Sequence, residues 1–138
     1  MSNELAHDLR QTVLHLARRV RAERADATMS DGKLSVLFVL MNEGAQTLGS
    51  LSEHERVTPP SMNRTINALV EQGLVTREPD ATDGRKVVID ISHAGRHLVK
   101  ETRRKRDAWF SSRLAALTTE ERYLLATAAP LLRRLADQ

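Results

Sequence analysis

The sequence predicts a mainly helical fold with one small β-hairpin, and three observations support this fold class. Apolar residues recur at steps of three and four along most of the 138 residues, which is the period of helices with one apolar face. The segment from Arg85 to Ile91 instead has apolar residues at every second position, as a half-buried strand does. The chain is long enough to bury a core and has no cysteine, so a single domain over residues 1–138 without disulfides is expected.

The first two helices are expected to differ in how they are buried. A long helix begins near the N-terminus, and its apolar residues form a single stripe: Leu5, Leu9, Val13, Leu16 and Val20. After a start signal at residues 29–32, residues 34–41 are apolar on nearly every side except at Ser35. The second helix is therefore predicted to be buried on several sides, whereas the first has one apolar face only.

Two short helices separated by a tight turn follow the buried helix. Thr47 is placed to cap the first, which is expected to end near Glu55-Arg56. The second begins at Thr58-Pro59-Pro60, because the threonine hydroxyl can accept from a free N–H and a proline at the first helical position needs no donor. Gly73 is expected to close it.

The second short helix has one apolar and one polar face. Its buried side is predicted to carry Met62, Ile66, Leu69 and Val70. The outward side has small or donor-rich residues, namely Ser61, Arg64 and Ala68, flanked by Pro60, Thr65 and Asn67. A helix that lies in the DNA major groove needs such a face, because small residues allow close approach and polar ones reach base edges or phosphates.

A β-hairpin is predicted directly after this helix. Leu74-Val75-Thr76-Arg77 and the segment from Arg85 to Ile91 are expected to pair, with Asp83-Gly84 supplying the turn at the tip. Arg85 and Lys86 then lie where the returning strand begins. Two short helices followed by a hairpin make a winged helix-turn-helix, so residues 30–92 are predicted to be a DNA-binding part.

Two further helices complete the chain. Ser92 can cap a long helix, and Thr118 with Glu121 offers a capping box for the last one. Trp109 on the long helix is interpreted as a core residue, and the alternative is that it borders a ligand cavity with His15 and Arg18. The last helix is expected to kink at Pro130. Its apolar positions include Leu124, Leu125, Ala128, Leu131, Leu132 and Leu135. A winged-helix core does not need these terminal helices for its own packing, so residues 1–29 and 93–138 are predicted to form a homodimer.

Three motifs in this order and spacing resemble the MarR (multiple antibiotic resistance regulator) family, and the resemblance spans essentially the whole chain. They are Gly73-Leu74-Val75-Thr76-Arg77, Asp83-Gly84-Arg85 and Ile89-Asp90-Ile91-Ser92-His93-Ala94-Gly95. The resemblance implies an obligate dimer whose first helix and last two helices interlock, a recognition helix from Thr58 and a wing arginine at Arg85. It also implies repression of nearby genes that a small aromatic or phenolic ligand relieves. The chain departs from the family pattern at Ser52 and Glu55-Arg56, where alanine and a glycine-containing turn are usual.

The expected DNA contacts come from the recognition helix and the wing. Arg64 lies opposite the apolar stripe and is predicted to read a base. Arg85 is expected to enter a narrow minor groove while the Asp83 carboxylate holds its guanidinium. Asn63 lies on the flank, where a backbone contact and simple exposure are both open. The candidate DNA-binding residues are Thr58, Pro60, Ser61, Asn63, Arg64, Thr65, Asn67, Arg77, Arg85 and Lys86.

A ligand site is predicted at the junction of the dimerisation and DNA-binding parts. His15, Arg18, Phe38 and Met41 are expected to wall it, and apolar walls with a few cationic donors suit an aromatic carboxylate or a phenol. His93 and His97 have the four-residue spacing of a metal pair, but a structural or surface role is favoured. No metal and no cofactor are therefore expected.

The sequence favours a regulator over other classes of protein. No Ser-His-Asp order, paired-carboxylate motif or phosphate-binding glycine loop stands out, so no enzyme is expected. No segment has the apolar length of a membrane span or the plan of a signal peptide, which predicts a cytoplasmic protein. The predicted function is that of a transcriptional repressor that binds palindromic double-stranded DNA as a homodimer and is released by a small aromatic ligand. The alternative is a non-specific architectural DNA-binding protein or a helical interaction module that uses the basic clusters at residues 18–24 and 100–106.

Overall fold

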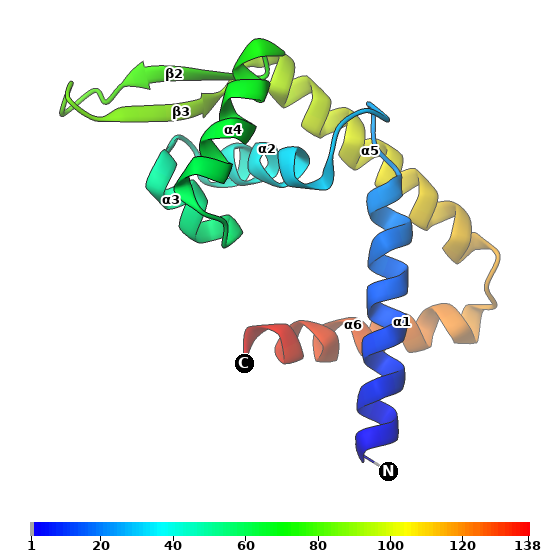
Figure 1. Ribbon diagram of the computed structural model, residues 1–138. Helices are drawn as coiled ribbons and strands as arrows, with labels where there is room; N and C mark the ends of the chain where they lie inside the picture. Colours follow the sequence, from blue (N-terminus) through cyan, green and yellow to red (C-terminus); the bar gives the residue numbers. More distant parts are fainter. Residues whose placement is uncertain (1) are drawn as a thin grey trace.

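Residues 2–138, which the computed structural model describes, form six helices and one small sheet (Figure 1). The elements follow in the order α1 (Ser2–Ala22), α2 (Asp31–Glu43), β1 (Gln46–Thr47), α3 (Leu48–Glu55), α4 (Pro59–Glu71), β2 (Val75–Pro79), β3 (Val87–Ile91), α5 (His93–Ala115) and α6 (Thr119–Asp137). The mainly helical fold with a small β wing, predicted from the sequence, is confirmed.

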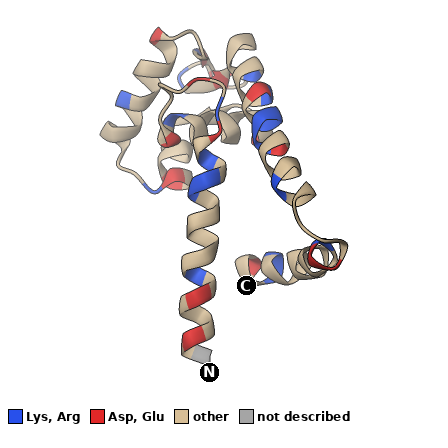
Figure 2. Ribbon diagram, turned by 90° about the vertical axis from the view of Figure 1, so that its right-hand side faces the viewer, with Lys and Arg blue, Asp and Glu red and all other residues tan. Residues whose placement is uncertain are grey.

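Helices α2, α3 and α4 gather with the sheet at one end of the molecule, and α1 and α6 project away from that end. Figure 1 shows the β2–β3 hairpin extending from it, while α5 leads in the other direction toward α6. Helices α1 and α6 overlap in that view but are separate in the perpendicular view of Figure 2. Both terminal helices thus have large surfaces that the rest of the described chain leaves uncovered.

Side chains cap the N-termini of five helices at the residues that the sequence predicts. In α2, α3, α4 and α5, a hydroxyl accepts from the backbone N–H three residues further on: Ser30, Thr47, Thr58 and Ser92. Thr118 and Glu121 form the predicted capping box with both reciprocal hydrogen bonds. Helix α4 ends next to Gly73, whose φ of 73° is the left-handed conformation that favours glycine.

The hydrophobic core lies between α2, α4, the sheet and the start of α5. Helix α2 is buried on several sides, as predicted, with Leu37 and Leu40 almost completely inaccessible to solvent. Other core residues come from every neighbouring element: Leu51, Met62, Ile66, Leu69, Val75, Ile89 and Val99. This core fixes α4 against the sheet and so sets the position of the recognition helix relative to the wing.

Two apolar residues lie outside this core, contrary to prediction. Val70 is 37% exposed, because the core meets α4 along Met62 and Leu69 and leaves Val70 at the edge. Trp109 is only half-buried, because α5 has already left the core at that point. Its ring contacts Phe110 edge-on, with the ring centroids 5.4 Å apart.

The sheet contains a short third strand that sequence periodicity does not reveal. The strand order is β1-β3-β2, and β1 pairs antiparallel with β3, with Gln46 opposite Ile89. Two residues are too few to show a period, so β1 is defined only by its partner strand. The predicted turn at Asp83-Gly84 is present, because the Lys86 N–H donates to the Asp83 carbonyl at 3.0 Å. The returning strand begins at Val87, so Arg85 and Lys86 lie in the loop before it and not in the strand.

The turn between α3 and α4 keeps its shape without the usual glycine. Arg56 has φ 55° and ψ 44°, a left-handed conformation that side chains seldom adopt. Ser52, where alanine is usual, is buried and donates its hydroxyl to the Leu48 carbonyl at 2.9 Å. The chain thus accommodates both departures from the family pattern within an intact helix-turn-helix.

Helix α6 runs without a break through Pro130. A proline there cannot donate to the carbonyl of Ala126. Within the described chain no residue of α6 is buried, so water can bind that carbonyl. Helix α6 therefore continues past Pro130, and the kink expected there stays a prediction.

Candidate DNA-binding interface

Helix α4 presents a polar ridge to solvent. The exposed residues along it are Pro60, Asn63, Arg64 and Asn67, followed by Val70 and Glu71. Arg64 lies on this ridge as expected, but Ser61, Thr65 and Ala68 are half-buried rather than outward. The solvent-facing side of α4 is thus centred on Asn63, Arg64 and Asn67 and does not include Thr65. The Thr65 hydroxyl donates to the Ser61 carbonyl of the same helix at 3.3 Å.

The first turn of α4 is held by its own capping interaction. The Thr58 hydroxyl accepts from the Ser61 N–H at 3.3 Å, and the Thr58 carbonyl accepts from the Met62 N–H at 2.9 Å. Pro60 follows on the exposed side. Thr58 therefore fixes where the recognition helix begins, with Pro60 at the front of its exposed ridge.

A side chain of the wing contacts the recognition helix. Arg77 lies on β2 opposite Ile89 of β3, and its Nη2 donates to Oδ1 of Asn63 at 3.0 Å. Both side chains are exposed. Arg77 and Asn63, two of the candidate DNA contacts that are 14 residues apart in the sequence, are thus brought together by the fold.

The wing tip holds its arginine as the sequence predicts. One carboxylate oxygen of Asp83 accepts from the Arg85 backbone N–H at 3.1 Å and from its Nε at 3.3 Å. The Arg85 side chain is 93% exposed, so the guanidinium is oriented without being buried. Lys86 is exposed beside it, and Figure 1 shows this tip at the far end of the hairpin.

Charge is unevenly distributed along the helices that leave the DNA-binding end. Figure 2 shows the acidic residues of α1 near its N-terminal end and basic residues at the end that joins the DNA-binding part. Along α5, basic residues outnumber acidic ones, seven to two, and Arg104 pairs with Glu101 at 2.7 Å. Part of the α5 basic cluster is therefore already neutralised on the helix itself.

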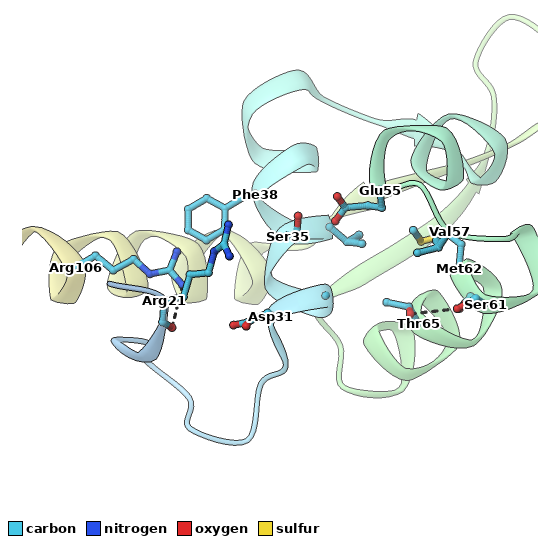
Figure 3. Close-up of a pocket in the computed structure, with 12 residues that line it drawn as sticks. Arg21, Asp31, Ser35, Phe38, Glu55, Val57, Ser61, Met62, Thr65 and Arg106 are labelled. Atoms are coloured by element: carbon cyan, nitrogen blue, oxygen red, sulfur yellow. Dashed lines mark hydrogen bonds between the residues drawn. The ribbon is translucent and has the colours of Figure 1, made fainter. Parts of the chain in front are cut away.

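A cavity of about 500 Å³ lies behind the recognition helix. It is bounded by the end of α1, by α2, by the turn before α4, by α4 itself and by α5. Figure 3 shows Arg21 and Arg106 converging beside Phe38 at one end, while Ser61 and Thr65 of α4 line the other. One space therefore touches helices of the predicted dimerisation part and the recognition helix.

Arginines crowd one end of this cavity. The Cζ of Arg106 lies 5.3 Å from the centroid of the Phe38 ring, a cation–π distance. Burial lowers the pKa of Arg106, and the charges of Arg24 and Arg21 lower it further, while Asp31 opposes them. An anion bound here would offset the mutual repulsion of these guanidinium groups.

The predicted ligand-pocket residues do not all meet at this cavity. Phe38 lines it, and Met41 packs against the core. His15 and Arg18 are exposed on α1 and are not among its lining residues. The cationic lining comes instead from Arg21 and Arg106, which belong to the basic clusters at residues 18–24 and 100–106.

The described chain offers neither a metal cluster nor a membrane-spanning helix. Among residues 2–138, no three His, Cys, Asp or Glu side chains are grouped to hold an ion, and His93 and His97 are both exposed. Over the same residues, no helix is at once long enough and apolar enough to cross a bilayer.

Comparisons with known proteins agree with this geometry. The sequence model described as the MarR family matches residues 29–87. An uncharacterized HTH-type transcriptional regulator from Mycobacterium leprae is 44% identical over 134 residues, which is 97% of this chain and 94% of that protein.

Solved structures share the same fold over almost the whole chain. A transcriptional regulator protein from Pseudomonas aeruginosa PA01 has a TM-score of 0.89 and 32% identity, covering 99% of this chain and 97% of that one. A mutant of MepR from S. aureus, solved bound to an oligodeoxyribonucleotide, has a TM-score of 0.71 and 18% identity, with 96% of each chain covered. On the strength of the M. leprae relative and the winged helix-turn-helix geometry, this chain belongs to the MarR family of HTH-type, DNA-binding transcriptional regulators.

Proposed function

We propose that this regulator is a homodimeric repressor that binds a palindromic operator and is released by a small aromatic acid or phenol. The main observation that supports a homodimer is the exposed apolar surface of the terminal helices. Exposed leucines and a valine lie on α1, at Leu5, Leu9, Val13, Leu14 and Leu16, and on α6, at Leu124, Leu125, Leu131, Leu132 and Leu135. An apolar surface of this extent on helices that project from the core needs a partner, and a second copy of the chain offers the same two helices.

Two-fold symmetry determines what such a dimer recognises. Two copies of α4 related by a two-fold axis meet two half-sites of inverted sequence about one helical turn, roughly 10 bp, apart. Selection of bound duplexes from a random pool should therefore return an inverted repeat, with specific affinity at least about a thousandfold above that for random duplex. Recovered duplexes without inverted symmetry, or without sequence preference, would favour the non-specific architectural alternative.

The recognition helix and the wing should contribute in different ways. Arg64 lies on the exposed ridge of α4, so Arg64→Ala should relax base preference at one operator position at a cost of about 1–3 kcal/mol. Arg85 is held by Asp83 at the wing tip, so Arg85→Ala should weaken binding to all duplexes and reduce the salt dependence of affinity. Titrations at several salt concentrations distinguish the two effects. Unchanged affinity and salt slope for Arg85→Ala would rule out the minor-groove contact.

The cavity behind α4 supports control by a ligand. Its residues come from α1, α2, the end of α3, the turn that follows, α4 and α5, so an occupant would contact two of the proposed dimerisation helices and the recognition helix. The Phe38 ring and the guanidinium groups of Arg21 and Arg106 suit an aromatic carboxylate. If the ligand prefers a dimer whose recognition helices do not fit the operator, its binding lowers DNA affinity.

Competition between ligand and operator tests this proposal. Calorimetry with benzoate and related aromatic acids should show binding that operator DNA weakens by the same factor as the ligand weakens operator binding. Arg21→Gln should reduce ligand affinity, whereas the control Arg18→Gln, on α1 but outside the cavity lining, should not. Equal ligand binding with and without operator, or equal losses in the two variants, would contradict the assignment of this cavity.

A further inference from the structure

The contact between Arg77 and Asn63 fixes which end of the asparagine amide faces outward. Nη2 of Arg77 donates to Oδ1 of Asn63 at 3.0 Å. A guanidinium has donors only, so the amide nitrogen of Asn63 has nothing to donate to on that side. The amide oxygen therefore faces the wing strand, and the amide nitrogen is left for another acceptor.

This orientation limits what Asn63 can recognise. The paired asparagine contact to adenine needs an amide oxygen as acceptor and an amide nitrogen as donor at the same time. In this chain Arg77 binds one lone pair of the Asn63 oxygen and holds that oxygen toward the wing strand, away from the outward side of the amide. Asn63 thus has a donor to offer, and the remaining N–H groups of Arg77 lie beside it.

We propose that Asn63 and Arg77 act as one unit that holds a DNA phosphate and sets the register of α4, without reading a base. Both side chains are exposed, and Asn63 lies on the α4 ridge on the side from which Arg77 reaches it. Several donors with one positive charge match a phosphate, which has several acceptor oxygens and one negative charge. The inference rests on the proposed DNA-binding function and assigns Arg77 as the residue that positions Asn63.

Because Arg77 is part of β2, the unit also connects the two DNA-binding elements. The strand that carries Arg77 pairs along its whole length with β3, which returns from the wing tip. One phosphate contact shared by α4 and β2 would hold the recognition helix and the wing in a fixed relation on the duplex. Loss of either side chain should then disturb the same contact.

A double-mutant cycle with a matched control tests the unit. Affinities of Asn63→Ala, Arg77→Ala and the double variant are measured on the selected operator and on a random duplex, with thermal unfolding as a check of folding. Each single variant should lose about tenfold on both duplexes with unchanged base preference, and the double variant should bind no more weakly than the weaker single one. The control is Asn67→Ala, on the same ridge but outside the pair. When Asn67→Ala is combined with Arg77→Ala, the fold-losses in DNA affinity of the two single variants should multiply.

The orientation of the amide has its own test in Asn63→Asp. This variant keeps an acceptor for Arg77 but replaces the outward donor by a carboxylate oxygen, so it should bind DNA more weakly than Asn63→Ala. An Asn63→Asp variant that binds DNA as tightly as the unmodified protein would overturn the proposal. A changed base preference in Asn63→Ala would also overturn it, as would an Asn63→Ala/Arg77→Ala variant whose loss of affinity equals the product of the two single losses. If the unmodified protein selects no operator, the proposed function fails, and the cycle on random duplex still decides this inference.

Discussion

The double substitution Leu131→Glu/Leu135→Glu is expected to make the protein monomeric and to lower its operator affinity by roughly a thousandfold or more. The two leucines are 50% and 61% exposed in the single chain, on a helix that has no buried residue among those described. If α6 packs against a second copy, two glutamates would place charge in an apolar interface, which is strongly unfavourable. A monomer would carry one recognition helix and lose the contacts of the second half-site.

The matched control for this variant is Arg133→Glu. Arg133 lies between the two leucines in sequence and therefore on the opposite side of α6, and its substitution changes the net charge by the same amount. Sedimentation at micromolar concentration should show a dimer for the control and a monomer for the leucine variant, with operator binding following the same order. A leucine variant that remains dimeric would show that the α6 stripe is not part of the interface.

The helix starts and the winged helix-turn-helix could be predicted because their signals are local. A capping hydroxyl such as that of Thr58 needs only the N–H three residues later, and a glycine at a positive φ, such as Gly73, needs only its own turn. The wing turn likewise depends on nearby residues, with hydrogen bonds from the Lys86 N–H to the Asp83 carbonyl and from the Asp80 N–H to the Lys86 carbonyl. Interactions of this kind are decided within a few residues, so the sequence states them directly.

The parts that could not be predicted depend on contacts between distant elements. Periodicity shows that α4 has an apolar face, but the half-burial of Ser61 and Thr65 depends on which helices surround that face. The ligand cavity is a clearer case, because Arg106 donates to the carbonyl of Glu23, which lies directly after α1 and 83 positions earlier in the sequence. An amphipathic pattern on α1 does not tell which of its arginines lies near α5, and Arg18 is expected where Arg21 is found.

One glycine of the predicted motif has a strong structural reason. A Cβ added at Gly95 would lie 2.3 Å from the Leu74 carbonyl oxygen and 2.7 Å from a side-chain carbon of Ile91. Neither neighbour can easily give way, because the same Leu74 carbonyl accepts from the Ser92 N–H at 3.0 Å, and Ile91 is buried in the core. The first turn of α5 therefore packs directly on the backbone that links α4 to β2.

Gly95→Ala is accordingly expected to lower the free energy of unfolding by about 3 kcal/mol and the Tm by roughly 10 °C. The matched control is Gly49→Ala in α3, where an added Cβ meets nothing within 4 Å and a helical alanine is favoured by up to about 1 kcal/mol over glycine. Because α5 connects the DNA-binding part to α6, a shift of its first turn should also move the wing relative to the dimer and weaken operator binding before the protein unfolds. Thermal unfolding of both variants measures the first effect, and operator titration well below the Tm measures the second. If Gly95→Ala has the same Tm as the unmodified protein, α5 can move away from Leu74 at little cost in stability.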